Sequence, residues 1–315
     1  MTSSKNIIIG TRGSDLALWQ STWVAKELRR IHPSITIETT VIKTTGDKIL
    51  DSPLSKIGDK GLFTKEIESA LLERSIDLAV HSLKDVPTNL AEGLAIGAIS
   101  EREDVRDVFI SHPRKKYPSF DAVPKNGSIA TGSLRRRSQL LAMRPDLRII
   151  DIRGNLKTRR TKLEESQWDG MLLAKAGVTR LGWGEIISEV LPPTTILPAV
   201  GQGALAVEIR KDDAFLASAL APLNHLPTAQ STAGERALLR HLEGGCQIPI
   251  GTYGRIESGR FVLDAVVGSI DGKKVVRGTI SGDPGDSERL GISLAKDLLH
   301  RGADEILKEI RTAGS

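Results

Sequence analysis

Short apolar strands and amphipathic helices alternate along the first two-thirds of the chain. Residues 6–10 form an apolar run that predicts a strand, and Ser14 has the position of an N-cap for a helix that reaches about residue 31. The same alternation continues in strands at residues 35–41, 76–80, 128–130, 148–152, 170–174 and 203–209, and in helices at 62–73, 133–143 and 155–164. Strands and helices in turn predict an α/β protein with largely parallel sheets.

Three stretches rich in polar residues or proline interrupt this alternation. Residues 101–124 indicate a change of domain, residues 191–193 mark another boundary, and residues 222–227 resemble a linker. Residues 43–60 lack clear periodicity and are expected to form a loop. The tail predicts a small α+β domain, with helices at 232–241 and from about 287 and 303, and strands at 261–267 and 274–280.

One short pattern occurs twice. Residues 7–14 and residues 128–133 share the order strand, threonine, Gly-Ser, helix. Each copy places hydroxyl groups and free backbone N–H groups at a helix N-terminus, which is a natural anion site. The repeat suggests two similar domains that face one cleft, although a pair of ordinary helix caps explains the pattern equally well.

The positive charge of the chain is concentrated in one segment. The net charge is +5, yet residues 131–162 hold ten Lys and Arg against two acids, a local charge of +8. A local charge implies a local anionic partner. Aromatic residues make up 3% of the chain and supply little surface for base stacking, so small anions are favoured over nucleic acid.

Targeting and redox features point to one compartment. No apolar run is long enough to span a membrane, and residues 1–5 lead into a strand without the apolar region of a signal peptide. A single cysteine excludes an intrachain disulfide. We therefore expect a cytoplasmic protein with no membrane partner.

The segment His81–Pro87 is the richest candidate for chemistry. It follows an apolar strand, where α/β proteins place ligand-binding groups, and Pro87 turns the chain so that Asp85 projects into a cleft mouth. A carboxylate beside Lys84 can move protons or stabilise a developing cation. Taken alone, such a tetrad is more often a solvated Lys–Asp pair at a strand end.

Two basic clusters lie at predicted junctions between a strand and a helix. Arg135 and Arg136 occupy the first turn of a helix, where the helix dipole disfavours cations unless an anion completes the site. Arg153 ends a strand, and Arg159 lies in the first turns of the next helix. Two junctions on one sheet edge favour a ligand site over a solvated basic face.

Two glycine-rich segments allow close backbone approach. Gly201–Gly203 and Gly244–Cys246 match neither a dinucleotide fingerprint nor a phosphate loop. Cys246 has the position of an accessible nucleophile, but a lone cysteine is more often a small buried apolar residue. The histidines lie far apart and no C-x-x-C occurs, so no metal site is expected.

Taken together, these motifs resemble the hydroxymethylbilane synthase family, also called porphobilinogen deaminases. The matching segments occur in the family's order along essentially the whole chain: Gly10–Ser14, Lys60–Phe63, His81–Pro87, Thr131–Arg136, Arg153–Arg159, Gly201–Ala204 and Gly244–Ile248. Each is modest by itself, but the combination is specific.

The resemblance implies three domains. Two α/β domains of the periplasmic-binding-protein type II kind are expected, domain 1 at residues 1–103 plus 203–221 and domain 2 at 104–202. A small C-terminal α+β domain at 222–315 carries the cofactor cysteine. Residues 43–60 correspond to the family's active-site loop. A monomer is expected.

The resemblance also implies the reaction. A dipyrromethane cofactor, made from two porphobilinogen molecules, is held by a thioether to Cys246. Four more porphobilinogens are added head to tail with loss of ammonia, and hydrolysis then releases linear hydroxymethylbilane. Six rings with two carboxylates each carry twelve negative charges, which suits the +8 segment.

Roles for single residues follow from the same resemblance. Asp85 is expected to assist loss of ammonia, to stabilise the resulting methylene-pyrrolenine cation and to help remove the pyrrole α-proton. The expected cofactor-binding residues are Lys84, Ser14, Thr131, Ser133, Arg135, Arg136, Arg153 and Arg159, besides Cys246. The expected substrate-binding residues are Arg12, Ser14, Lys60, Phe63, Arg153, Arg159, Arg180 and Gln202.

Two alternatives from other functional classes remain at this point. One is a non-catalytic anion receptor of the same two-domain architecture, against which the combination of Asp85 with Cys246 counts. The other is a nucleic-acid-binding protein that uses residues 131–162, which the low aromatic content disfavours.

Overall fold

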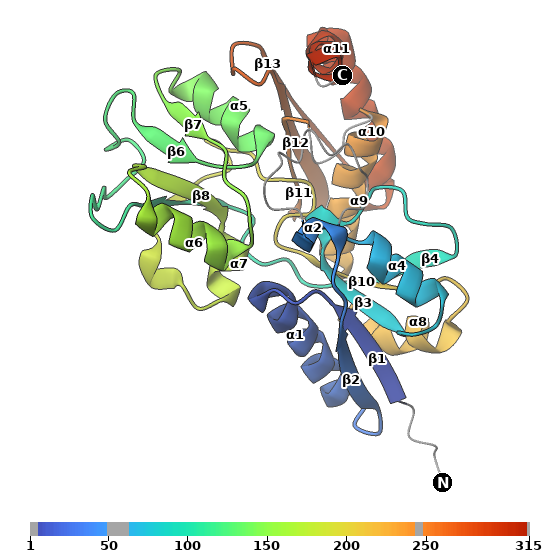
Figure 1. The fold of residues 1–315 in the computed structure, drawn as a ribbon. Helices are drawn as coiled ribbons and strands as arrows, with labels where there is room; N and C mark the ends of the chain where they lie inside the picture. Colours follow the sequence, from blue (N-terminus) through green and yellow to red (C-terminus); the bar gives the residue numbers. More distant parts are fainter. Residues whose placement is uncertain (1–5, 49–62, 243–247, 314–315) are drawn as a thin grey trace. The chain divides into compact units, whose positions relative to one another are not determined.

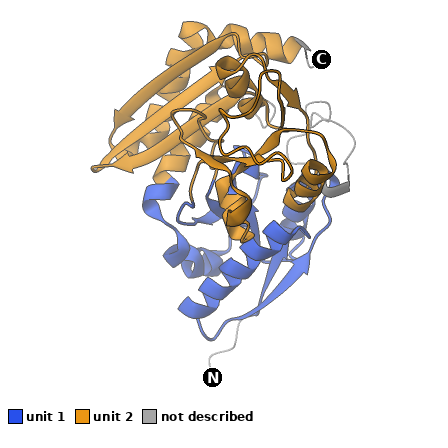
Figure 2. Cartoon of the chain, turned by 90° about the vertical axis from the view of Figure 1, so that its left-hand side faces the viewer, with its two compact units in different colours: residues 1–50, 59–103, 203–229 blue, residues 51–58, 104–202, 230–315 orange. Residues whose placement is uncertain are grey.

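The computed structural model describes residues 6–48, 63–242 and 248–313 (Figure 1). The chain divides into two compact units (Figure 2). Unit 1 holds residues 1–50, 59–103 and 203–229, and unit 2 holds residues 51–58, 104–202 and 230–315. The division of the chain into three domains stays a prediction.

Unit 1 is built on a five-stranded sheet of order β2-β1-β3-β10-β4. Its strands are β1 (Asn6–Thr11), β2 (Thr36–Val41), β3 (Leu78–Ser82), β4 (Leu94–Ile99) and β10 (Leu205–Arg210). The strands β2, β1 and β3 are parallel, whereas β10 runs antiparallel to both of its neighbours. The predicted helices and strands are therefore present, but the sheet is mixed. The antiparallel strand enters after the excursion through residues 104–202, so no right-handed crossover constrains its direction.

Strand periodicity decides which helices cover which face of this sheet. Leu78 and Val80 of β3 point into a core shared with α1 (Asp15–Ile31) and α8 (Ala214–Leu220). Ala79, between them, points to the opposite face and packs with α4 (Lys65–Leu72). Residues 43–60 were expected to form a loop, but Thr45–Lys48 form the short helix α2; residues 49–60 of that segment lie outside the described residues.

Unit 2 repeats the plan of unit 1 in a second sheet of order β7-β6-β8-β5-β9. Its strands are β5 (Asp107–Ser111), β6 (Ser128–Ala130), β7 (Arg148–Ile150), β8 (Gly170–Ala174) and β9 (Glu189–Leu191). Here β5 is the one antiparallel strand, as β10 is in unit 1. The helices between them are α5 (Leu134–Met143), α6 (Leu156–Glu165), α7 (Lys175–Arg180) and the single turn Gly184–Ile186. The motif that occurs at residues 7–14 and 128–133 therefore has the same place in both sheets, because β1 with α1 and β6 with α5 occupy equivalent positions.

The described residues of the C-terminal part of unit 2 form an antiparallel sheet covered by helices. The strands β11 (Ile250–Glu257), β12 (Arg260–Gly268) and β13 (Val275–Gly282) lie in sequence order. The helices α9 (Leu226–His241), α10 (Ser287–Leu298) and α11 (Asp304–Ala313) enclose an apolar core with Phe261 and Leu263 at its centre. The predicted α+β tail is confirmed.

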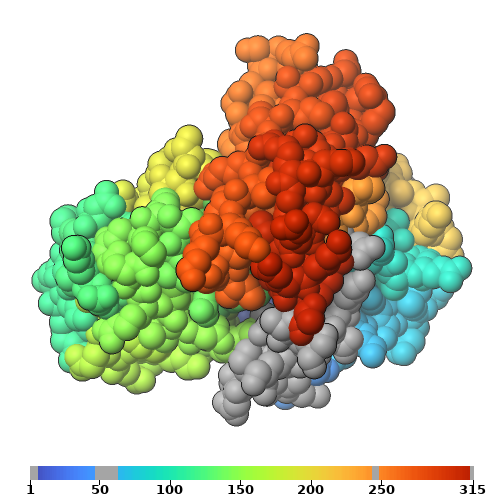
Figure 3. All heavy atoms as spheres, turned by 90° about the horizontal axis from the view of Figure 1, so that it is seen from above, coloured from blue at the N-terminus to red at the C-terminus, as the bar shows by residue number. Residues whose placement is uncertain are grey.

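Close glycine packing joins this tail to α5 within unit 2. A Cβ on Gly272 would lie 2.4 Å from the backbone nitrogen of Ala142, and one on Gly268 would lie 2.2 Å from the Ser138 hydroxyl. Only glycine allows such an approach. The space-filling view shows the orange to red C-terminal residues in contact with the green residues of the same unit (Figure 3).

Three expectations from the sequence are wrong in detail. Residues 101–124 were taken only as a domain change, but they contain the fully buried strand β5. Neither β4 nor β11 was predicted. Residues 222–227 are not a linker, because a single turn at Ala221–Leu223 is followed by α9. Pro227 fits the start of a helix because the first turn needs no backbone N–H group from it.

No helix within the described ranges combines the length and the hydrophobicity that a bilayer crossing requires.

The backbone at Gly203 yields a first prediction. Its φ is +94°, and a Cβ there would lie 2.3 Å from the carbonyl oxygen of Glu103. Gly203→Ala should lower the free energy of unfolding by about 2 kcal/mol or more, because backbone strain adds to a clash with another backbone. Gly182→Ala is the matched control: its φ is +70° with no atom within 4 Å, so only the strain of about 1 kcal/mol applies. Urea unfolding measures both, and equal losses would contradict the role of the close approach.

Candidate active site

Asp85 lies on a tight turn at the carboxyl end of β3. The turn Leu83–Asp85 is closed by a hydrogen bond from the Val86 N–H to the Leu83 carbonyl at 3.1 Å. Leu83 is buried, and its N–H donates to the Ala204 carbonyl at 3.0 Å, which fixes the turn to the sheet. Lys84 and Asp85 are half-buried. Across the described residues, no ion pair or side-chain hydrogen bond holds the Asp85 carboxylate.

A buried histidine–carboxylate pair supports the strand that precedes this turn. The His81 Nε2 lies 3.0 Å from the Glu208 Oε2, and both side chains are buried. On the next residue, the Ser82 hydroxyl accepts from the Gln20 amide at 2.8 Å. Glu208 belongs to the apolar strand β10 and was not predicted as part of the site. An acid inside an apolar strand is the signal that could have revealed it.

The carboxyl end of β1 lies on the same sheet edge as Asp85, because β1 and β3 are parallel neighbours. Ser14 caps α1 as expected, and its hydroxyl accepts from the Ala17 N–H at 3.3 Å. The Arg12 guanidinium lies over the Phe63 ring, 4.3 Å from its centroid. The structure therefore brings Arg12 and Phe63 together within unit 1.

In unit 2, the predicted residues again gather at one sheet edge. Thr131 and Ser133 directly follow β6, and Arg153 follows the parallel strand β7. The buried Thr131 hydroxyl accepts from the Ser133 N–H at 3.2 Å, so the start of α5 is ordered by its own side chains. Asp107 lies at this edge as well, because β5 is antiparallel and pairs Asp107 with Ala174.

Asp107 is the centre of a buried ion cluster. Its carboxylate accepts from Arg135 Nη1 at 2.8 Å and from Arg136 Nε at 3.0 Å and Nη2 at 2.8 Å. All three side chains are at least nine-tenths buried. Burial alone would raise the pKa of Asp107, but the two guanidinium groups hold it far below its usual value. The ligand-binding role of the two arginines stays a prediction, and the structure gives both of them an internal counter-ion that sequence reasoning missed.

Gln202 also belongs to this cluster. Its amide nitrogen donates to Asp107 Oδ1 at 2.8 Å and to the Val105 carbonyl at 2.7 Å. Gln202 is buried, so this amide is engaged with protein groups. Its predicted contact with substrate stays a prediction.

Three arginine nitrogens in unit 2 are buried without an acceptor among the described residues. They are the Nε atoms of Arg135, Arg137 and Arg153. Arg153 Nε lies 3.7 Å from Asp151 Oδ2, which is an ion pair but too long for a hydrogen bond. Burial lowers the pKa of the Arg135 and Arg153 guanidinium groups. Buried cationic donors without acceptors are suited to an anionic ligand such as a carboxylate.

For the other predicted residues the structure gives fewer contacts. The Arg159 Nε donates to the Gly154 carbonyl at 2.8 Å, and Arg180 ends α7. Lys60 and Cys246 lie outside the described residues. No group of three potential metal ligands occurs in the described part of the chain.

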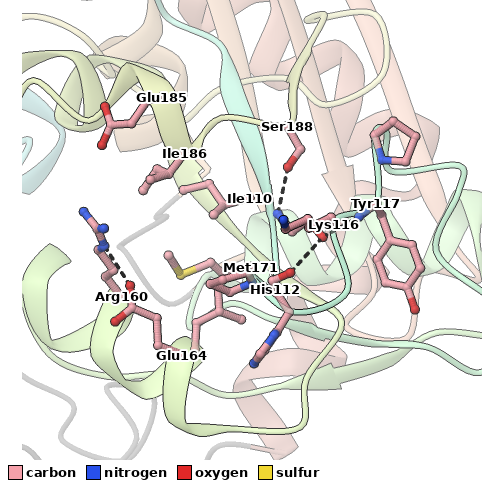
Figure 4. Close-up of a pocket in the computed structure, with 14 residues that line it drawn as sticks. Ile110, His112, Lys116, Tyr117, Arg160, Glu164, Met171, Glu185, Ile186 and Ser188 are labelled. Carbon is pink, nitrogen blue, oxygen red and sulfur yellow. Dashed lines mark hydrogen bonds and ion pairs between the residues drawn. The ribbon is translucent and has the colours of Figure 1, made fainter.

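A pocket of about 440 Å³ in unit 2 is separate from these residues (Figure 4). It is lined by Ser111 at the end of β5 and Met171 near the start of β8, so it lies at the sheet edge opposite to Asp107. Two contacts link polar groups of its lining: Arg160 pairs with Glu164 at 2.9 Å, and the Ser188 hydroxyl accepts from the Ser111 backbone N–H at 3.0 Å (Figure 4). None of the predicted site residues lines it.

That opposite edge has its own buried acid. Asp169 accepts from Lys115 Nζ at 2.7 Å, from the Tyr117 hydroxyl at 3.1 Å and from the N–H and hydroxyl of Ser128 at 2.7 and 3.0 Å. Burial opposes ionisation, but these hydrogen bonds lower the pKa of Asp169 to about 2. The sheet of unit 2 thus carries one anchored carboxylate at each edge.

Comparison with known protein families decides what this arrangement serves. Residues 7–218 match the family model described as porphobilinogen deaminase, dipyromethane cofactor binding domain, and residues 229–300 match the porphobilinogen deaminase C-terminal domain. The chain belongs to the porphobilinogen deaminase family. The resemblance seen in the motifs is confirmed. The chain is a transferase that makes hydroxymethylbilane and carries a dipyrromethane cofactor, and not a non-catalytic receptor.

Relatives of this family match over nearly the full length. Porphobilinogen deaminase from Chlorobium phaeobacteroides (strain BS1) is 54% identical, with 98% of each chain covered. The enzyme from Carboxydothermus hydrogenoformans is 53% identical, also with 98% of each chain covered.

Solved structures of lower similarity include binding proteins. The probable amino-acid ABC transporter extracellular-binding protein ytmK from Bacillus subtilis gives a TM-score of 0.44 at 10% identity, covering 70% of this chain and 92% of that one. A Salmonella typhimurium periplasmic binding protein with high arginine specificity gives 0.39 at 13% identity, covering 73% and 94%.

The lowered pKa of Asp169 gives a prediction with a definite sign. The folded-state pKa of Asp169, about 2, lies below the ordinary 3.8. The ionised carboxylate therefore stabilises the folded state fully above about pH 4, and this stabilisation is lost as the pH falls toward 2. The shift corresponds to about 2 kcal/mol. The difference in unfolding free energy between the wild type and Asp169→Asn should therefore shrink by about this amount between pH 6 and pH 2. Urea unfolding at several pH values measures it, and a difference independent of pH would contradict the assignment.

Proposed function

We propose that Asp85 is the catalytic acid–base group of this porphobilinogen deaminase. The observation that carries the proposal is its half-buried carboxylate, fixed by the turn Leu83–Asp85 yet held by no ion pair or side-chain hydrogen bond among the described residues. A carboxylate whose charge is not already neutralised inside the protein can interact with a developing cation. Its position also leaves it able to exchange protons.

The chemistry of porphobilinogen defines what Asp85 has to do. The bond between the aminomethyl carbon and its nitrogen breaks, and the nitrogen leaves as ammonia after taking a proton. The carbon that remains is part of a cation conjugated with the pyrrole ring. A new carbon–carbon bond then forms at a pyrrole α-carbon, which loses its proton. Asp85 is proposed to assist the first proton transfer, to stabilise the cation and to accept the last proton.

The dipyrromethane cofactor supplies the free pyrrole α-carbon to which the first substrate is joined. We propose that Cys246 holds it through a thioether and that its carboxylates bind to Arg135, Arg136, Arg153 and Arg159. Lys84, Ser14, Thr131 and Ser133 are proposed to add hydrogen bonds. The buried Nε atoms of Arg135 and Arg153 support this role, because each still needs an acceptor.

Incoming porphobilinogen is proposed to bind through its two carboxylates. Arg12 is supported by its place on the same sheet edge as Asp85, with its guanidinium over the Phe63 ring. Ser14, Lys60, Arg153, Arg159, Arg180 and Gln202 complete the proposed set.

The wider setting of the enzyme is also proposed. Three domains at residues 1–103 plus 203–221, 104–202 and 222–315 are consistent with the two sheets of the α/β type and the antiparallel tail sheet. We propose a cytoplasmic monomer that binds no nucleic acid. The single cysteine and the scarcity of aromatic residues support these assignments.

The role of Asp85 predicts the behaviour of Asp85→Asn. The variant keeps the shape of the side chain and should fold with an unchanged thermal midpoint, but its turnover should fall by about a hundredfold or more because the charge is lost. Hydroxymethylbilane formation from porphobilinogen measures the rate. Asp212→Asn, which changes an exposed carboxylate in the same unit, is the matched control and should keep full activity. A near-normal rate in Asp85→Asn would remove Asp85 from the mechanism.

The role of Cys246 predicts a change in mass. The purified wild-type chain should be heavier than the calculated 34.1 kDa by two linked pyrroles, and Cys246→Ser should lose that adduct because a hydroxyl is a far weaker nucleophile than a thiolate. Intact mass spectrometry under denaturing conditions measures both. Cys246 is the chain's one cysteine, so no other thiol replaces it. An unchanged adduct in the variant would place the anchor at another residue.

A further inference from the structure

We infer that Asp107 is a positioning residue for cofactor binding: its charge holds Arg135 and Arg136 in one buried cluster whose net charge of +1 receives a single carboxylate of the dipyrromethane. The inference rests on the proposed function of the two arginines. It concerns a residue that neither the motifs nor the family resemblance singled out.

The contacts of the cluster leave little freedom to its members. Arg136 donates to Asp107 with two nitrogens, and its Nη1 donates to the Leu172 carbonyl at 2.9 Å. Arg135 Nη1 donates both to Asp107 at 2.8 Å and to the Leu197 carbonyl at 2.7 Å. Among the described residues, Asp107 is the one group that binds both guanidiniums, so their relative placement depends on it.

Further hydrogen bonds hold Leu197, whose carbonyl accepts from Arg135. The Gln139 amide nitrogen donates to the Leu197 carbonyl at 3.1 Å, and the Leu197 N–H donates to the Gln139 Oε1 at 2.9 Å. The Gln202 amide nitrogen donates to Asp107 Oδ1 at 2.8 Å, the oxygen that also accepts from Arg136 Nη2. The cluster is therefore ordered from several sides before any ligand binds, which is what preorganised recognition requires.

The charges in the cluster do not cancel. Two guanidiniums and one carboxylate, all nine-tenths or more buried, leave one positive charge away from water. A buried charge without a counter-ion is unfavourable, and here it is distributed over groups that repel each other. The donor that lacks an acceptor belongs to Arg135, whose Nε is buried with no partner among the described residues. One ligand carboxylate would satisfy both the charge and the donor.

Removing the charge of Asp107 should therefore weaken ligand binding, although it makes the cluster more positive. Without the shared carboxylate, the two guanidiniums repel each other inside a low-dielectric site and lose their common orientation. A simple attraction model predicts the opposite result, because a cluster of charge +2 would attract a carboxylate more strongly. The two views can be separated by experiment.

The experiment measures cofactor loading as a function of porphobilinogen concentration. Each full-length chain is produced in cells that cannot make porphobilinogen and is then incubated with it, and the fraction carrying the two-pyrrole adduct is measured by intact mass. Asp107→Asn keeps the shape and removes the charge, whereas Asp107→Glu keeps the charge and changes the shape. Asp169→Asn is the matched control, since it removes an equally anchored carboxylate from the opposite edge of the same sheet.

We expect the half-loading concentration of Asp107→Asn to rise about tenfold or more, and those of Asp107→Glu and Asp169→Asn to stay within about threefold of the wild type. The thermal midpoint should fall in all three variants, so that loading follows charge at residue 107 and not stability. If Asp107→Asn does not fold, the test rests on Asp107→Glu. This variant should reach half-loading at the wild-type porphobilinogen concentration although its thermal midpoint is lowered.

Several outcomes would overturn the inference. Loading of Asp107→Asn at or below the wild-type concentration would support simple attraction, and a larger shift in Asp107→Glu than in Asp107→Asn would indicate packing alone. An equal shift in Asp169→Asn would indicate general destabilisation. A wild-type chain that gains no adduct would instead refute the proposed function on which the inference rests.

Discussion

The arrangement of the arginines in unit 2 depends on the need of a buried cation for a counter-ion. A guanidinium away from water is tolerated only beside a counter-ion and with its donors satisfied. Asp107 supplies that counter-ion to Arg135 and Arg136, and backbone carbonyls take further donors. Because one carboxylate serves two arginines, the cluster stays positive. A site of this kind suits an enzyme whose substrate and cofactor are both rich in carboxylates.

The repeated sheet plan explains why charged groups gather where they do. In each five-stranded sheet four strands run in one direction and one interior strand is antiparallel to them, so one edge collects the carboxyl ends of the parallel strands. The helices that follow these strands begin at this edge, which is where α/β proteins bind ligands. Asp85 and Arg12 lie at this edge in unit 1, and Thr131 and Asp107 lie at the equivalent edge in unit 2.

Each unit also contains a buried, hydrogen-bonded polar pair next to the sheet edge that carries the proposed site residues. His81 with Glu208 in unit 1 and Gln202 with Asp107 in unit 2 are buried, and the proposed mechanism assigns none of them to the reacting atoms. Their hydrogen bonds restrict the segments that carry the working side chains. Such rigidity allows a half-buried carboxylate such as Asp85 to keep its place with no side-chain partner in the described part of the chain.

The sequence by itself determined what depends on neighbouring residues: the cap at Ser14, the turn that presents Asp85, the alternation of strands and helices, and the order of motifs that reveals the family. Only the tertiary structure decided that Arg135 and Arg136 share Asp107, 28 and 29 residues away, and that His81 pairs with Glu208, 127 residues away. Local propensity carries no information about such partners. They meet only when strands that are distant in sequence become neighbours in a sheet, and that pairing is set by the whole fold.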